Sequence, residues 1–182
     1  RSLARVKKLL AALPGGGGTP LASAARCAGE LAEAVRRKGQ TPAVVEAALH
    51  HYRALAALPA VEQATAMLEQ RAILCPVRDG PSGCVTINAR ISHALRAHAG
   101  DHGHVLMVLE NLPLLGLSNG DIGIVWRHPD GLKAHFRCGG RLLAIALPAL
   151  PKHEPAYALT VHKAQGSEFG HVDLVLPDSD SP

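Results

Sequence analysis

Aromatic residues are scarce in this chain of 182 residues. Phe, Trp and Tyr together make up 3% of it, whereas hydrophobic residues make up 47%. The core must therefore be built mainly from Ala, Leu and Val. No apolar run approaches the roughly 18 residues that a membrane-spanning helix needs. We therefore expect a soluble, cytoplasmic protein with no membrane contact, large enough for one domain or for a domain with a small insert.

Close cysteine pairs are also missing. Zinc sites and redox pairs usually show tight spacing, so the sequence predicts ordinary reduced thiols and no metal site. The histidine-rich stretch "HALRAHAGDHGH", from His93 to His104, has no cysteine partner or standard ligand spacing. A helix end followed by an exposed loop accounts for it. The four cysteines are widely separated: Cys27, Cys75, Cys84 and Cys138.

A strong excess of positive charge is absent from most of the chain. The net charge is +4, and residues 1–70 hold 9 Lys+Arg against 5 Asp+Glu, whereas residues 71–182 hold 10 of each. A basic balance can indicate nucleic-acid binding. Here it is modest and lies away from the motif described below, so charge alone does not predict a DNA-binding protein.

The signatures of a complete nucleotide-hydrolysing enzyme are missing as well. No G-x-x-x-x-G-K-[ST] phosphate loop occurs, and "PGGGGTP" lacks the lysine. No apolar strand ends in Asp-Glu, and no arginine follows Arg141. The sequence therefore predicts no catalytic residue in this chain and no ATP hydrolysis by it.

The first seventy residues have the pattern of helices. Helices are predicted from Ser2 to about Leu13 and from Leu21 to Lys38, with "PGGGGTP" as the break between them. Thr41 is expected to cap a third helix, with Pro42 at its first position. Helical spacing predicts a buried face on this third helix: Val45, Leu49, Tyr52 and Leu55.

A strand, a glycine loop and a helix follow. The strand is predicted at Ile73–Val77, and the helix carries Ile87, Ile91 and Leu95 on one side. This order is typical of the ligand-binding edge of a parallel sheet. The loop offers Arg78 and the helix offers Asn88. On these residues alone, a solvated arginine and a packing asparagine explain the pattern better than ligand contacts do.

From about His104 to Leu150 the hydrophobic period becomes two. "HVLMVLEN", "DIGIVWRH", "KAHFR" and "RLLAIAL" are strand candidates, and Asn119-Gly120 and Asp130-Gly131 predict tight turns. We expect a small β-barrel insert at 103–150, with Trp126 and Phe136 at least partly buried in it. The surrounding α/β domain would comprise 1–102 and 151–182, and a helix-turn-strand pattern is expected from Tyr157.

The stretch "YALTVHKAQGSEFGHVDLVLPD", Tyr157 to Asp178, concentrates polar residues before a strand-like run. Thr160 and His162 are able to donate hydrogen bonds to phosphate oxygens, and Lys163 adds a positive charge. Gly166 would let the backbone approach a ligand closely. The side chains of the following Ser-Glu pair are able to bond hydroxyl groups.

This stretch is also compatible with two different structures. One is a plain polar turn before an ordinary strand. The second is a hydrolytic triad of Ser167, His162 and Asp173, although the G-x-S-x-G elbow of such enzymes is absent. From these residues alone, both stay open.

The same stretch resembles motif V of superfamily 1 DNA helicases of the RecD type, the alpha subunit of exodeoxyribonuclease V. "ILCPVRDGPSGCVTINARI" is similar to the segment that enters the second motor domain of this family, and "GLSNGDIGIV" to the start of its SH3-like insert. The three stretches occur in family order and span about Ile73 to Asp178. The resemblance implies an α/β fold: a RecA-like, P-loop-NTPase-type second motor domain carrying a small SH3-like β-barrel.

The resemblance also implies ligands and roles. ATP and Mg²⁺ would serve the longer protein, with none bound to this chain. Single-stranded DNA would be a ligand and RecB and RecC subunits the partners, although action without them stays open. The implied DNA-facing residues are Thr160, His162, Lys163 and Asn88. The implied nucleotide-facing residues are Gln165, Gly166, Ser167, Glu168 and Arg78.

The missing signatures, and Arg1 in place of an initial Met, lead us to expect a C-terminal piece of a RecD subunit. The resemblance implies that the longer protein is an ATP-dependent 5′-to-3′ helicase of a helicase/nuclease complex for double-strand break repair and recombination. A stand-alone SH3-like module that binds nucleic acid or protein is the alternative.

Overall fold

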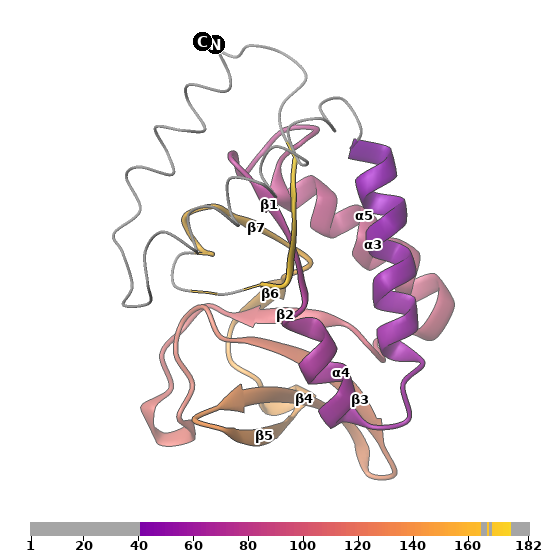
Figure 1. Ribbon diagram of the computed structural model, residues 1–182. Coiled ribbons are helices and arrows are strands. Elements are labelled where there is room, and N and C mark those ends of the chain that lie inside the picture. Colours follow the sequence, from indigo (N-terminus) through magenta and orange to yellow (C-terminus); the bar gives the residue numbers. More distant parts are fainter. Residues whose placement is uncertain (1–40, 165–166, 168, 176–182) are drawn as a thin grey trace.

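The computed structural model describes residues 41–164, 167 and 169–175, which form two sheets with helices packed against them (Figure 1). The helices predicted at 2–13 and 21–38 lie outside these residues. The described helices are α3 (Thr41–Ala56), α4 (Val61–Leu68) and α5 (Cys84–Ala99), with short 3-10 turns η1 (Pro113–Leu115) and η2 (Leu147–Ala149). The described strands are β1 (Arg71–Cys75), β2 (Val105–Val108), β3 (Ile122–His128), β4 (Gly131–Cys138), β5 (Arg141–Ala146), β6 (His153–Pro155), β7 (Ala158–Thr160) and β8 (His171–Leu174).

The first sheet is parallel, with β1 between β7 and β8. Ile73 pairs with Ala158 on one side and with Asp173 on the other. The prediction that the strands near 73–77 and 171–176 share one sheet is therefore confirmed. β1 ends at Cys75, two residues early, where Pro76 has no N–H to continue the ladder.

The helix expected at Tyr157 is wrong, because Ala158–Thr160 is a strand. Its backbone pairs with Ile73–Cys75, more than eighty residues earlier in the chain. Three apolar or β-branched residues fit either structure locally, and this distant partner decides between them.

Helices α3 and α5 form a layer beside the parallel sheet (Figure 1). The predicted inner face of α3, from Val45 to Leu55, is buried. Ile87, Ile91 and Leu95, which were predicted to lie on one side of a helix, are all buried in α5, and α5 contacts β7. Within the described part of the chain, no helix has the length and apolar character that crossing a membrane requires.

The second sheet is antiparallel, in the order β5-β4-β3-β2-β6. All four strands predicted between 104 and 147 are confirmed. β3 and β4 are joined through Pro129 and Asp130, and β4 and β5 through Gly139 and Gly140. Both of these glycines have positive φ, +55° and +78°, as a type I′ turn requires.

β6 pairs with β2, so the sheet extends beyond residue 150, the predicted end of the insert. Its closure into an SH3-like barrel stays a prediction.

Alternate residues of this sheet enter two different cores. Met107 and Trp126 pack with α3, α5 and the parallel sheet, whereas Val108, Val125 and Phe136 pack in a second core within the antiparallel sheet. Trp126 is 8% exposed and Phe136 is 1% exposed, which confirms their predicted burial. The two sheets are therefore joined by a shared apolar layer, which fixes the loops of one sheet relative to the other.

Candidate nucleic-acid interface

The carboxyl ends of β1 and β7 lie side by side. Cys75 pairs with Thr160, and the Val161 N–H donates a hydrogen bond of 3.1 Å to the Cys75 carbonyl. The loops that follow the two strands therefore leave the sheet at the same edge, where parallel α/β sheets bind their ligands. One of these loops carries Arg78, and the other carries Lys163.

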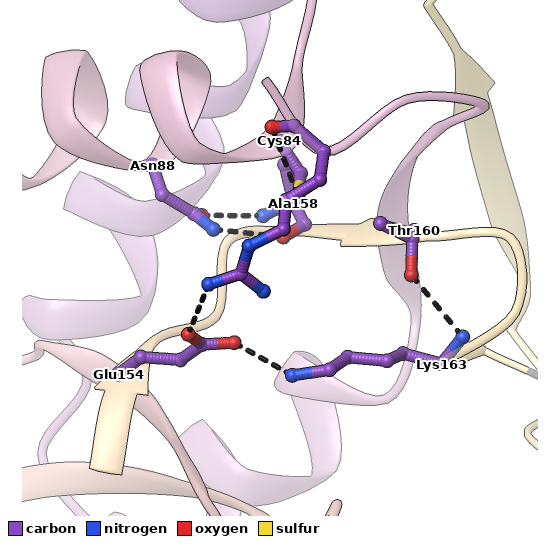
Figure 2. Close-up of polar contacts among 7 residues, drawn as sticks. Cys84, Asn88, Glu154, Ala158, Thr160 and Lys163 are labelled. Carbon is purple, nitrogen blue, oxygen red and sulfur yellow. Dashed lines mark hydrogen bonds and ion pairs between the residues drawn. The ribbon is translucent and has the colours of Figure 1, made fainter.

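Glu154 connects these two loops through one carboxylate. Lys163 Nζ lies 2.7 Å from its Oε1, and Arg78 Nη2 lies 3.4 Å from its Oε2. Figure 2 shows Glu154 reaching from β6 toward Lys163. Sequence reasoning missed Glu154, because it stands between Pro151 and Pro155 in a stretch without periodicity. Its closeness to the motif along the chain was the available signal.

The electrostatics of this cluster favour a charged carboxylate. Burial acts to raise the pKa of Glu154, but the hydrogen bond and charge of Lys163, together with the charge of Arg78, outweigh it and hold the pKa below its ordinary value. The Arg78 side chain is 55% exposed and that of Lys163 is 34% exposed. Both cations therefore remain accessible to a ligand from solvent.

Asn88 is placed by the structure inside the fold, behind the motif. Its Nδ2 donates to the Ala158 carbonyl at 2.9 Å, and the Ala158 N–H donates to its Oδ1 at 2.8 Å (Figure 2). The side chain is buried, and both ends of its amide hold the β7 backbone. Asn88 is thus a positioning residue for the motif, and a contact between Asn88 and DNA stays a prediction.

The Arg78 loop is closed tightly onto the start of α5. The Arg78 carbonyl accepts a hydrogen bond of 3.1 Å from the Val85 N–H, and the Cys84 thiol lies 3.7 Å from the same oxygen. A Cβ added at Gly83 would lie 2.5 Å from the Arg78 carbonyl oxygen, so the loop needs glycine there.

Burial raises the pKa of Cys84, and that of Cys75 to about 12, as expected for unreactive thiols.

The turn after β7 carries the predicted DNA-facing side chains. Thr160 Oγ1 accepts a hydrogen bond of 3.3 Å from the Lys163 N–H, which leaves its hydroxyl proton free to donate (Figure 2). His162 is exposed beside it, and Ser167 is exposed further along. The Ser167 N–H donates to the Ala164 carbonyl at 3.1 Å. The remaining predicted nucleotide-facing residues, Gln165, Gly166 and Glu168, lie outside the described residues.

The third member of the alternative hydrolytic triad has a different setting. Asp173 is 2% exposed in β8, with Arg71 Nη2 2.6 Å from its Oδ2 and His171 Nε2 3.3 Å from its Oδ1. Its carboxylate balances a partly buried arginine inside the sheet. This structural use of Asp173 favours a role in the fold over a role in a hydrolytic triad.

The histidine-rich stretch ends in a buried residue, although His93 and His98 within it are exposed as expected. His104 is 5% exposed, where an exposed loop was predicted, and it contacts the ring of Tyr157 edge-on at 5.9 Å. Its carbonyl accepts from the Val125 N–H at 2.7 Å, so it extends the pairing of β2 with β3. His102 accepts a hydrogen bond from the Arg127 N–H through Nδ1. The exposed loop expected for this stretch is therefore wrong at His104, whereas the strand expected from about His104 agrees with this pairing.

Comparison with known proteins identifies relatives of this chain, although no family model matches it. It is 35% identical over 136 residues to the RecBCD enzyme subunit RecD of Mycobacterium tuberculosis, a match that covers 71% of this chain and 24% of that protein. It is 33% identical over 126 residues to the subunit of the same name from Mycolicibacterium smegmatis, covering 65% and 22%. The match to the Haemophilus influenzae subunit is 40% over 80 residues, covering 44% and 11%. The chain therefore spans less than a quarter of the length of these relatives.

Proposed function

Because this chain belongs to the RecD family over the segment that it shares with these subunits, we propose that it supplies the DNA- and nucleotide-contacting edge of the second motor domain of a RecD subunit. The longer protein is then an ATP-dependent helicase subunit with 5′-to-3′ polarity, of which this chain is one part. It works with RecB and RecC subunits in the repair and recombination of broken DNA. ATP and Mg²⁺ bind to the longer protein, in which the missing phosphate loop and carboxylates would lie.

One observation carries the proposal: the two segments that match the family's motifs meet at one edge of the parallel sheet. Arg78 follows β1 and Lys163 follows β7, and both contact the same carboxylate. Thr160 has a hydroxyl proton to donate, and His162 is exposed on the same turn. Cationic and hydrogen-bonding groups of this kind contact phosphate oxygens in nucleic-acid complexes.

The chain order supports the two-part architecture implied by the resemblance. α5 follows β1, and β7 pairs in parallel with β1 on its return. The antiparallel sheet lies between α5 and β7 in sequence, as an insert would. A RecA-like sheet with an SH3-like insert has this arrangement, and we propose that these are the two folds.

The proposal is tested by measuring the affinity of the purified chain for fluorescent oligo(dT) by anisotropy over a range of salt concentrations. We expect weak binding that falls with salt, because counterions are released when phosphates are bound. His162→Ala and Thr160→Val should each weaken binding by about 1.5–3 kcal/mol if they remove a hydrogen bond to a charged phosphate. His98→Ala, at an exposed site on α5, is the matched control and should leave the affinity unchanged. Equal affinities for all four proteins would contradict the proposal.

A stand-alone protein-binding module is the second candidate, and one observation favours it. Leu114, on the 3-10 turn η1 between β2 and β3, is 101% exposed, and Leu115 beside it is 43% exposed. Adjacent exposed leucines are typical of surfaces that contact another protein. Under this alternative, Leu114→Ser would abolish binding to the partner while the motif variants left it intact. Under the helicase proposal, Leu114→Ser leaves oligo(dT) binding unchanged.

A further inference from the structure

The two cations at the proposed ligand edge are already occupied by an internal anion. Arg78 and Lys163 approach different oxygens of the Glu154 carboxylate, at 3.4 and 2.7 Å. The cations come from loops of the parallel sheet, whereas Glu154 belongs to β6 of the antiparallel sheet. The part of the fold that presents the cations is therefore different from the part that neutralises them.

We propose that Arg78 and Lys163 form a phosphate site and that Glu154 is its internal counter-ion, which a phosphate group must displace in order to bind. The chemical class of the ligand is a phosphate oxyanion, carried either by the DNA backbone or by a nucleotide. The inference rests on the proposed function for the source of the phosphate. The site itself rests on the geometry of the three side chains.

The geometry suits a phosphate because one anionic group already bridges both cations. A phosphate, like a carboxylate, offers neighbouring acceptor oxygens to two donors at once. Arg78 presents a planar fork of donors and Lys163 a compact charge, the two cation types that commonly bind phosphate. A phosphate has more acceptor oxygens than Glu154 has, so it is able to satisfy donors that the carboxylate leaves to water.

The pairing is weak enough to be displaced. Both cations are well exposed, and ion pairs between exposed side chains typically contribute only about 0–1 kcal/mol. The backbone of Glu154 is held in the sheet, where it pairs with Met107 of β2. The carboxylate therefore leaves the cations by rotating its own side chain, while β6 keeps its place.

Displacement has a consequence for the relation between the two sheets. In the free chain, the Glu154 carboxylate ties the antiparallel sheet to the Arg78 and Lys163 loops. Once phosphate takes its place, both loops are free of that tie and bind the ligand instead. A bound ligand and the Glu154 carboxylate thus compete for the same two cations, while the shared apolar layer keeps the sheets together.

The test uses the full 182-residue chain with inorganic pyrophosphate as the probe, titrated by NMR or calorimetry. Glu154→Gln should bind pyrophosphate up to about five times more tightly than wild type, since it removes a competing pair worth up to about 1 kcal/mol. Glu46→Gln, at an exposed position of α3, removes the same charge and is the matched control, expected to bind like wild type. The double variant Glu154→Gln/Lys163→Met should lose the gain.

A Glu154→Gln affinity no higher than that of Glu46→Gln would overturn the inference. Thermal unfolding monitored by circular dichroism establishes that each variant is folded. If Glu154→Gln is not folded, Glu154→Asp replaces it, since its shorter side chain draws the carboxylate back from the two cations. Its matched control is then Glu46→Asp, which likewise keeps the charge. Titrations with oligo(dT) and with a non-hydrolysable ATP analogue identify the source, which is the ligand that shows the same gain. A gain with pyrophosphate but with neither of these two ligands would support the counter-ion role and contradict the proposed function.

Discussion

Asn88 holds the backbone of Ala158 through both ends of its amide, with hydrogen bonds of 2.9 and 2.8 Å. The two residues are seventy positions apart, on α5 and on β7. Because Ala158 begins the strand that leads into Thr160 and Lys163, this clamp sets where the motif leaves the sheet. Both the amino end and the carbonyl end of the Asn88 side-chain amide are used in this way, so the clamp acts on structure.

Replacing this amide should destabilise the fold. Asn88→Ala would leave the buried N–H and carbonyl of Ala158 without their partner, and we expect it to reduce the free energy of unfolding by about 1–3 kcal/mol. Urea unfolding followed by circular dichroism measures the loss. Asn111→Ala is the control, because Asn111 accepts its hydrogen bond from Asn119 at an exposed site, and its loss should be smaller. Equal losses for the two variants would show that the clamp is not important.

Gly83→Ala tests the tight closure of the Arg78 loop. The added methyl group would lie 2.5 Å from backbone atoms of Arg78 and Asp79, so the loop must move. We expect a loss of stability of about 1–3 kcal/mol from overpacking and weaker binding of pyrophosphate as Arg78 shifts. At Gly100 an added methyl group meets open space, although φ is +65°. Gly100→Ala should therefore reduce stability through backbone strain and leave pyrophosphate binding unchanged. If Gly100→Ala also bound pyrophosphate more weakly, the weaker binding of Gly83→Ala would not be explained by a shift of the Arg78 loop.

Stability should fall as the pH drops below about 6.5, the ordinary pKa of histidine. Burial lowers the pKa of His104 and that of His135 in the folded chain, so the unfolded chain takes up protons first and is favoured as the pH falls. The decline begins as the unfolded chain starts to take up protons around pH 6.5, and only at about pH 7.5 and above are both states essentially neutral at these residues, so that they contribute no slope. Urea midpoints at pH 7.5, 6.0 and 5.0 measure the effect.

A variant of His104 assigns this pH dependence. His104→Phe keeps an aromatic ring against Tyr157 and should flatten the decline, whereas His98→Gln, at an exposed site, should not. An unchanged decline in His104→Phe would exclude His104 as a source. His135 is then the second source. Its Nε2 lies 2.8 Å from Nε2 of His128, and a hydrogen bond between these two nitrogens requires that one of them be unprotonated.

The purified chain should release no phosphate from ATP in the presence of Mg²⁺. It has no G-x-x-x-x-G-K-[ST] loop and no Asp-Glu strand end to hold the metal, and both groups are needed for phosphoryl transfer in P-loop enzymes. A malachite green assay detects released phosphate. Hydrolysis that stays with the chain through successive purification steps, and that Lys163→Met abolishes, would contradict this expectation.

Most elements of the described fold could be predicted from local patterns. The strands between 104 and 147 alternate with period two and are separated by stretches that contain Asn-Gly, Asp-Gly and Gly-Gly, so periodicity and turn composition agree. The buried faces of α3 and α5 follow from helical spacing. Periodicity did not say that the two faces of β2 and β3 enter different cores, because that depends on which element packs on each face.

The candidate site was only half predictable. Arg78 and Lys163 stand in recognisable motifs, but the contact between them runs through Glu154, which pairs with Met107 from a strand of three residues. So short a strand has no period to detect, and its partner lies far away in the chain. The role of Asn88 was equally hidden, because an amide clamp on a distant backbone leaves no local pattern.

DNA contact at the edge formed by the carboxyl ends of β1 and β7 is the central proposal. Photo-crosslinking tests it most directly: oligo(dT) containing 4-thiothymidine is irradiated with the chain, and the modified peptides are mapped by mass spectrometry. We predict crosslinks within 76–83 and 157–164, reduced in His162→Ala and competed by unlabelled oligo(dT). Crosslinks confined to 105–155, in the antiparallel sheet, and unaffected by His162→Ala would contradict the proposal and favour a stand-alone binding module.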